Sequence, residues 1–135
     1  MNKVNFIKEF ELNTPSWNKL LFDLNYSHIN NELFKNTSPG FFVSHSAYRI
    51  KKVQKVLKKL NLKEAHLYIN VLDSKTFGPH KDECDVWFWQ VKGKTIWEVE
   101  NNQYTLEEGD LIYIPKGILH NVIPIGPRAG ISMSK

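Results

Sequence analysis

The residues of this sequence best suited to chemistry are His80, Asp82 and His120. His80 and Asp82 are separated by one residue, so on an extended strand their side chains would point to the same face. Two imidazoles and one carboxylate form the facial triad that holds a non-haem Fe(II) and leaves positions open for oxygen and a co-substrate. The pattern therefore predicts a catalytic metal site, with iron as the metal.

Other residues that could bind a metal fit this pattern less well. Glu83 and Asp85 share the strand face of His80 less directly than Asp82 does. Cys84 shares the parity of His80, and we expect it to be a buried, unreactive thiol near the metal. His66 begins a predicted strand, where a surface or supporting role is expected.

The first part of the chain, residues 1–63, is predicted to be a helical cover. Ser16 and Pro15 provide a helix start before an apolar stripe that includes Trp17 and Leu20. A second helix is expected where apolar residues recur at helical spacing from Ile50 among six lysines. These are Lys51, Lys52, Lys55, Lys58, Lys59 and Lys63. A solvated face is the favoured interpretation of these lysines, with an anionic partner as the alternative.

The second part, residues 64–135, is predicted to be a β-barrel core. Short apolar runs separated by turn residues are typical of an all-β sandwich or barrel. Tight turns are expected at Lys92-Gly93-Lys94 and Asn101-Asn102. The predicted strands are 66–72, 85–91, 95–99, 103–106, 111–115, 119–123 and 129–134.

Strand parity also predicts how the two parts pack. In an extended segment, Trp87, Trp89 and Val91 point away from the face that carries Phe88. Two tryptophans on an outer sheet face need cover, which the helices can supply through residues such as Trp17. We therefore expect the N-terminal helices to lie on the outer face of the barrel.

Two motifs give the sequence a family resemblance. Gly109, Pro115, Gly117 and His120 follow the spacing of the second cupin motif. The segment 77–82 resembles the first cupin motif in its JmjC-like form, in which an aspartate replaces the second histidine. The closest likeness is to the JmjC-like oxygenases of the ribosomal-protein hydroxylase branch, over about residues 66–134. The residues that carry it are His80, Asp82, Val86 to Trp89, Gln90, Gly93 and Trp97.

This resemblance implies a mainly β fold, the cupin double-stranded β-helix or jelly-roll barrel, with Fe(II) and 2-oxoglutarate as cofactors. The family usually places a lysine for the distal carboxylate of 2-oxoglutarate where this chain has Thr95. Arg128 is the predicted substitute, because a planar guanidinium binds a carboxylate at two points. An exposed turn arginine is the alternative. Tyr68, Asn70 and Ser132 join Thr95 as further candidates for cofactor binding.

Length and composition agree with one cupin domain over residues 1–135. Apolar residues make up 41% of the chain and charged residues 24%, a balance typical of a folded globule. The apolar runs are too short to span a bilayer and no secretory signal is evident, so we expect a cytoplasmic protein without a membrane partner. Cys84 is the single cysteine, so no internal disulfide is possible.

Three functions are compatible with these observations. The favoured one is an Fe(II)- and 2-oxoglutarate-dependent oxygenase, of the dioxygenase or hydroxylase type, acting on a peptide or a small molecule. The second is a metal-dependent cupin lyase, isomerase or dioxygenase that acts on a small acid without 2-oxoglutarate. The third is a binding module without catalysis. A nucleic-acid partner is not expected, and a homodimer is left open.

Overall fold

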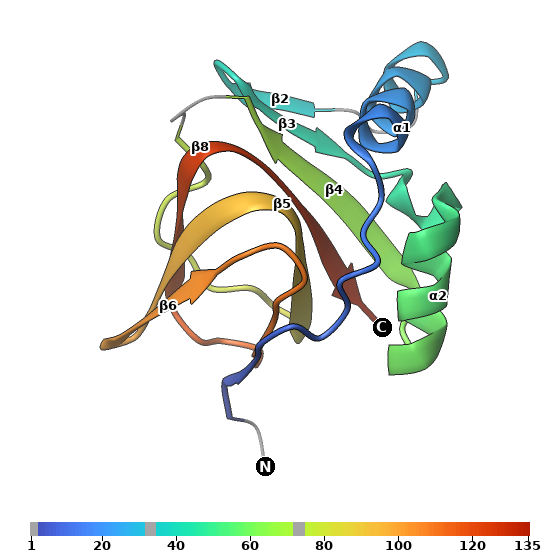
Figure 1. Ribbon diagram of the computed structural model, residues 1–135. Helices are drawn as coiled ribbons and strands as arrows, with labels where there is room; N and C mark the ends of the chain where they lie inside the picture. The colour runs from blue at the N-terminus through green and yellow to red at the C-terminus, as the bar shows by residue number, and fades with distance from the viewer. Residues whose placement is uncertain (1–2, 32–34, 72–74) are drawn as a thin grey trace.

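The computed structural model describes residues 3–31, 35–71 and 75–135 of the chain. Its core is one sheet with the strand order β1-β7-β5-β8-β4-β3-β2, and β6 pairs with β5. The sheet rolls into a barrel, and the two helices lie on one side of it (Figure 1). The elements are β1 Asn5–Ile7, α1 Trp17–Ile29, β2 Lys35–Ser38, β3 Phe41–Ser44, a short 3-10 helix η1 Ala47–Arg49, α2 Lys51–Leu60, β4 Glu64–Asn70, β5 Val86–Val99, β6 Asn102–Leu106, β7 Leu111–Ile114 and β8 His120–Ser134. The predicted β-barrel core with N-terminal helices on its outside is confirmed.

The two longest strands, β5 and β8, run antiparallel along most of their length and hold the barrel together. At one end of β5, Val86–Trp89 pairs with β7 as well as with β8. At the other end, Thr95–Val99 pairs with β6 on one side and with β8 on the other. In addition to β8, β5 therefore pairs with β7 at its first end and with β6 at its second end.

The predicted turn at Lys92-Gly93-Lys94 was wrong, because β5 continues through these residues. The register of β5 against β8 shifts on both sides of Lys92, and Gly93 has a φ of +70°. A side chain on Gly93 would also collide with the Pro127 carbonyl and with the backbone of Arg128. Glycine is thus required for a bulge that bends the strand, rather than for a hairpin.

The remaining strand predictions differ mainly at their ends. The predicted strands 119–123 and 129–134 form the single strand β8. The turn predicted at Asn101-Asn102 lies one residue earlier, at Glu100-Asn101, because Asn102 already belongs to β6 and pairs with Val99. Residue 72, the last residue of the predicted strand 66–72, lies outside the described residues. No described helix is both long enough and apolar enough to cross a membrane.

The first half of the chain is less helical than predicted. Both expected helices are present, and Ser16 caps α1 by accepting a hydrogen bond from the backbone of Lys19 (3.2 Å). The same half also supplies β1, which pairs with β7, and the β2–β3 hairpin, which extends the sheet beyond β4. Short strands of this kind give too few residues for a clear alternation of apolar and polar positions.

Two apolar clusters fill the molecule. The larger one joins the helices to the sheet and includes Leu20 and Trp89, both fully buried, with Trp17 packed against it. The predicted cover of the outer tryptophans by the N-terminal helix is confirmed. The smaller cluster lies inside the barrel and includes Phe88 and Trp97. This inner cluster forms the surroundings of the candidate site.

Candidate metal centre

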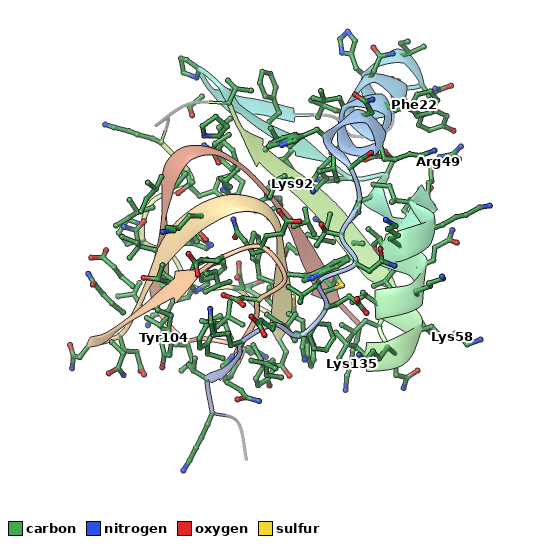
Figure 2. The ribbon with its side chains drawn as sticks, viewed as in Figure 1. Phe22, Arg49, Lys58, Lys92, Tyr104 and Lys135 are labelled. Carbon is green, nitrogen blue, oxygen red and sulfur yellow. The ribbon has the colours of Figure 1, made fainter. Side chains whose placement is uncertain are left out.

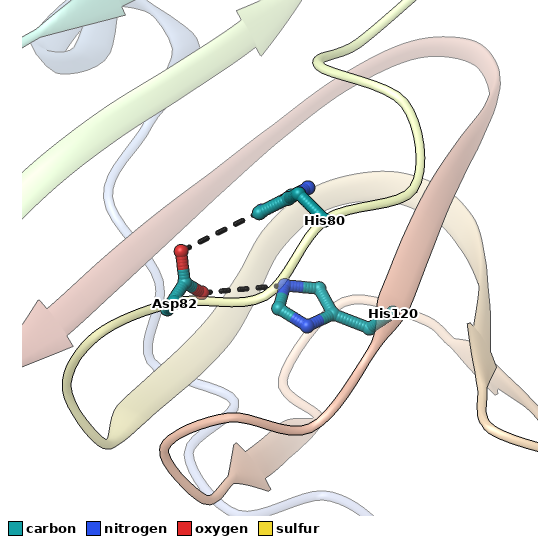
Figure 3. A group of neighbouring side chains, drawn as sticks. All are labelled: His80, Asp82 and His120. Atoms are coloured by element: carbon teal, nitrogen blue, oxygen red, sulfur yellow. Dashed lines mark ion pairs between the residues drawn. The ribbon is translucent and has the colours of Figure 1, made fainter.

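His80, Asp82 and His120 come together at one mouth of the barrel, on two neighbouring segments (Figure 3). His80 and Asp82 lie in the connection between β4 and β5, and His120 is the first residue of β8. An isolated antiparallel bridge pairs His80 with His120, and both backbone hydrogen bonds of this bridge are 2.9 Å long. The Gly117 amide also donates to the Asp82 carbonyl (3.0 Å). Extended pairing in this connection is limited to the bridge at His80, so the side chains of His80 and Asp82 converge without a regular strand.

The three side chains point toward a common centre. Asp82 Oδ1 lies 3.6 Å from His80 Nε2, and Asp82 Oδ2 lies 3.3 Å from His120 Nε2. One ligand atom from each residue lies within 4.8 Å of those of the other two. With metal–ligand distances of about 2.0–2.2 Å, as in protein sites with imidazole and carboxylate ligands, adjacent ligands lie roughly 3 Å apart. The observed spacing fits three ligands on one face of a metal ion.

Each imidazole is oriented by the backbone two residues before it. His80 Nδ1 lies 2.7 Å from the Gly78 carbonyl, and His120 Nδ1 lies 3.0 Å from the Ile118 carbonyl. A carbonyl only accepts, so Nδ1 must carry the proton in both rings. In the neutral rings, Nε2 then keeps its lone pair on the side of Asp82, as a metal ligand requires.

The electrostatics of the cluster keep Asp82 ionised. Without a metal, His120 can also carry a proton on Nε2, and the hydrogen bond that this protonated ring donates to Asp82 is the main cause that lowers the pKa of the Asp82 carboxyl. Burial is the largest influence on the pKa of His120 and would lower it, but the hydrogen bonds with Asp82 and Ile118 outweigh it and raise the pKa. The carboxylate is therefore available as an anionic ligand near neutral pH.

A chain of side chains inside the barrel supports His120 from behind. The indole of Trp97 stacks on the His120 ring, with centroids 5.7 Å apart and planes 18° apart. Trp97 Nε1 donates to Thr95 Oγ1 (3.1 Å), whose hydroxyl donates to Gln90 Oε1 (2.9 Å). Thr95 is fully buried, and its hydroxyl is occupied by these two hydrogen bonds. The structure thus places Thr95 behind the metal ligand, and it is not among the residues that line the cavity described next.

The triad opens into a cavity of about 240 Å³ inside the barrel. Its polar lining includes Tyr68, Ser132 and Arg128, and Phe88 and Trp97 contribute apolar walls. Ligand sites for drug-sized molecules usually have volumes of about 300–1,000 Å³, so this cavity suits a smaller molecule. Three of the five residues predicted to bind a cofactor therefore line the same cavity as the metal ligands.

Arg128 is a buried cation that has no carboxylate partner among the described residues. Its side chain is 1% exposed, its Nε donates to Asn70 Oδ1 (2.6 Å), and its Nη1 has no hydrogen-bond partner within the described part of the chain. Its guanidinium carbon lies 5.8 Å from the ring centroids of both Phe41 and Phe88. Burial lowers the pKa of Arg128 to about 9. The alternative of an exposed turn arginine was wrong, because β4 and β5 flank β8 and cover this position. Asn70 lies behind Arg128 and supports it.

The other predicted residues occupy the wall of the cavity. Burial raises the pKa of Tyr68, and the nearby charge of Asp82 adds to this effect, so the phenol remains a hydrogen-bond donor. Ser132 lies within hydrogen-bonding reach of Tyr68. Cys84 lines the cavity but is exposed, so the prediction of a buried thiol was wrong. His66 also lines the cavity and stacks on His45, with centroids 4.1 Å apart.

Sequence reasoning assigned no role to the rings that hold the two histidines. Phe77 meets His80 edge-on at 5.9 Å, and Trp97 supports His120. Trp97 was among the residues that carry the family resemblance, but its stacking on His120 was not predicted. The acceptor carbonyls of Gly78 and Ile118 have no sequence signal, because backbone groups carry none.

Comparisons with known proteins agree with this geometry. Residues 68–130 match the family model described as the cupin domain. Two curated relatives carry the name bifunctional lysine-specific demethylase and histidyl-hydroxylase NO66. The Dictyostelium discoideum protein is 27% identical over 84 residues, covering 44% of this chain and 16% of that protein. The Caenorhabditis elegans protein is 29% identical over 83 residues, covering 42% and 11%. The predicted resemblance to cupins of the JmjC-like type is confirmed.

Solved structures show the same fold. The ribosomal oxygenase YcfD from Escherichia coli, in complex with cobalt and 2-oxoglutarate, matches with a TM-score of 0.78 at 15% identity. That match covers 97% of this chain and 47% of the YcfD chain. KdgF from a Halomonas species matches with a TM-score of 0.54 at 17% identity, covering 78% of this chain and 91% of that chain. The protein has the cupin fold, and it spans about half the length of YcfD and a smaller part of its curated relatives.

Proposed function

We propose that this chain is an Fe(II)- and 2-oxoglutarate-dependent oxygenase of the hydroxylase type. The observation that carries the proposal is the coexistence, in one small cavity, of a pre-oriented His–Asp–His triad and a buried arginine that no described acidic residue pairs with. The triad supplies ligands for a metal, and the arginine supplies a site for a carboxylate. A co-substrate that must reach both needs a carboxylate at one end and metal-binding oxygens at the other, as 2-oxoglutarate has.

The donor set fits iron. Two neutral imidazoles and one carboxylate are the ligands of non-haem Fe(II) oxygenases, and a bound iron would supply open positions for oxygen and the co-substrate. The chain's own contribution is orientation. The Gly78 and Ile118 carbonyls fix the ring tautomers, and Trp97 and Phe77 hold the ring planes.

Arg128 would bind the distal carboxylate of 2-oxoglutarate. A buried cation is strongly destabilised unless an anion accompanies it. Asn70 fixes the Nε edge of the guanidinium, and Nη1 is left to donate to a ligand. Tyr68 and Ser132 line the same cavity and can donate further hydrogen bonds to that carboxylate. The aromatic walls formed by Phe88 and Trp97 would exclude water from the reacting groups.

The substrate class is proposed from the relatives. Their names describe demethylation, histidyl hydroxylation and a ribosomal oxygenase activity. We propose hydroxylation of a peptide or a small molecule that reaches the metal through the open side of the cavity, where Glu83 and Cys84 are exposed.

The test is the formation of succinate by purified protein supplied with Fe(II), 2-oxoglutarate, oxygen and ascorbate, which supplies the two electrons that reduce the second oxygen atom when no substrate is present. We expect succinate and carbon dioxide from 2-oxoglutarate, with loss of this turnover in His80→Ala and Asp82→Ala. Binding of Co(II) and 2-oxoglutarate under anaerobic conditions should be lost in the same variants. Folded, metal-loaded protein that neither binds nor consumes 2-oxoglutarate would contradict the proposal.

The second candidate is a cupin enzyme that acts on a small acid without 2-oxoglutarate. It is favoured by the same Arg128, which would bind a substrate carboxylate equally well. Turnover or tight binding of another small carboxylate, with no succinate formed, would favour this candidate.

A further inference from the structure

A second hollow, called the groove below, lies between α1 and the junction of η1 with α2. It has a volume of about 510 Å³, roughly twice that of the metal-site cavity. Four cationic side chains line it: Lys19, Arg49, Lys51 and Lys52. Figure 2 shows Phe22 and Arg49 close together on this side, with Lys58 further along α2. None of the residues that line this groove belongs to the metal centre.

The described part of the chain neutralises the positive charge of this groove only in part, with one acidic side chain in the lining against four cations. Asp23 is the acidic residue in its lining, and it is 4% exposed and accepts hydrogen bonds from Ser44 (3.0 Å) and Ser46 (2.7 Å). Helix α2, Lys51–Leu60, contains no acidic residue. The side chains of Lys19 and Lys51 are exposed, and they form no hydrogen bond or ion pair with described residues.

The sequence of α2 works against its own stability. Lysines occupy its first two positions, where the helix dipole favours acidic residues, and no side chain caps its first amides. Lys51 and Lys55 are four residues apart, as are Lys55 and Lys59, and like charges at this spacing destabilise a helix. An anionic partner in the groove would relieve both effects.

Aromatic side chains decide which kind of anion fits. Phe22 is 71% exposed at the edge of the groove, and Arg49 lies over the Tyr26 ring at 3.8 Å from its centroid. Cations that follow a groove, together with exposed rings on which bases can stack, are the combination that binds single-stranded nucleic acids. Lys51, Lys55 and Lys58 span about 10 Å along α2, which corresponds to roughly three phosphates at one charge per 3.4 Å of strand.

We propose that this groove binds single-stranded nucleic acid. Lys19, Arg49 and Lys51 bind phosphates, Lys55 and Lys58 extend the phosphate path along α2, and Phe22 stacks on a base. This surface goes beyond the proposed oxygenase function and is independent of it, since it uses no residue of the metal centre. It also gives the lysines of α2 a role other than the solvated face favoured by the sequence.

The test is fluorescence anisotropy of labelled uridine and deoxythymidine oligomers of about 12 nucleotides, measured with metal-free protein from about 50 mM salt upward. We expect binding with a log–log salt slope of about −3.5, since the five cations named above contribute about −0.7 each. Stronger binding of the uridine oligomer would identify RNA as the ligand, stronger binding of the deoxythymidine oligomer would identify DNA, and equal binding would show a groove that accepts either strand.

Two variants separate charge from stacking. Lys19→Glu with Lys51→Glu should weaken binding at least about tenfold and make the slope less steep by about 1.4. Phe22→Ala should weaken binding at least about fivefold without changing the slope. The control exchanges Lys75 and Lys116, both exposed and outside the groove, for glutamate, and should leave affinity within about twofold.

Three outcomes would overturn the proposal. The first is absence of binding to either oligomer at the lowest salt concentration. The second is an equal loss of affinity in the groove variant and the control variant, which would indicate a general charge effect. The third is binding to phosphatidylserine vesicles without binding to oligomers, which would assign the groove to a lipid surface. All substituted side chains are exposed, so each variant should retain the fold, as far-UV circular dichroism can verify.

Discussion

Replacement of Arg128 by methionine should separate ligand binding from stability. Burial lowers the pKa of Arg128 from the ordinary range of an arginine to about 9. At 1.36 kcal/mol per pKa unit, this corresponds to a penalty of about 5 kcal/mol for the charged side chain in the fold. Because the pKa is lowered, the penalty is fully present below about pH 9 and disappears only as the pH rises above about 9 toward the ordinary pKa of an arginine.

Two contacts of Arg128 act in the opposite direction. Removal of the guanidinium deprives the buried Asn70 of a donor, which costs about 1–3 kcal/mol. It also removes the contacts with the Phe41 and Phe88 rings, worth roughly 1–2 kcal/mol together. Methionine fills most of the space with apolar atoms. The net expectation for Arg128→Met at pH 7 ranges from no change to a gain of about 3 kcal/mol in unfolding free energy.

The assay is urea unfolding at pH 7 with and without 2-oxoglutarate, in the presence of a divalent metal. In the unsubstituted protein, ligand at 100 times its Kd should raise the unfolding free energy by about 2.7 kcal/mol, and this increment should vanish in Arg128→Met. Arg49→Met is the matched control, because Arg49 also lies over an aromatic ring but is exposed. The control should lose at most about 1 kcal/mol and keep the ligand effect.

Two results would refute this reasoning. A loss of more than about 2 kcal/mol in Arg128→Met would show that the arginine contributes to the stability of the core. Retention of the stabilisation by 2-oxoglutarate would show that the carboxylate binds elsewhere. The two results are independent, so the electrostatic argument and the ligand assignment can fail separately.

Three further perturbations test other parts of the structure. Gly130→Ala should destabilise the protein by about 1–3 kcal/mol in urea unfolding, because the new methyl group would collide with the Phe88 ring. Thr95→Val should weaken Co(II) binding about 10- to 100-fold in a calorimetric titration, because the Trp97 indole loses its acceptor and no longer holds the metal-binding ring beside it. Burial lowers the pKa of His66 in the folded protein, so as the pH falls this imidazole is protonated first in the unfolded chain. The free energy of unfolding should therefore decrease as the pH falls through 6.5 and level off below the pKa of His66 in the folded state. His66→Asn should flatten this pH dependence.

Each of these perturbations has its own control. Phe88→Leu should relieve the collision when combined with Gly130→Ala, and an additive loss in the double variant would contradict the packing argument. Thr95→Ser keeps the hydroxyl and should keep metal affinity, whereas equal losses in the serine and valine variants would indicate a general packing effect. For His66, an unchanged pH dependence in the asparagine variant would place the titrating group elsewhere.

The triad could be predicted from the sequence because its signal is local. His80, Asp82 and the glycine–proline spacing before His120 are all visible in the printed chain. The parity argument selected two side chains that the structure does bring together with His120, although no strand forms there, since a single bridge to His120 is enough to hold His80 in place. The grouping of these three side chains was therefore more predictable than the secondary structure that carries them.

The features that the sequence did not reveal depend on distant contacts. Gly93 flanked by lysines has the composition of a turn, and only the close approach of β8 at Arg128 makes it a bulge within one long strand. The spacing of Arg128 from His120 suggested a carboxylate anchor, but its burial follows from pairing with β4 and β5. Thr95 occupies the position expected for a cofactor residue, yet Trp97 and Gln90 take both of its hydrogen bonds.

The bridge between His80 and His120 has a consequence for local opening of the molecule. It joins the connection between β4 and β5 to the start of β8, about 40 residues further along the chain, through two backbone hydrogen bonds. An ion bound between them would act as a covalent crosslink does, by restricting a loop whose closure is otherwise entropically unfavourable. The amides of residues 80 and 120 should then exchange with deuterium much more slowly once the ion is bound, while amides in the middle of β5 change little.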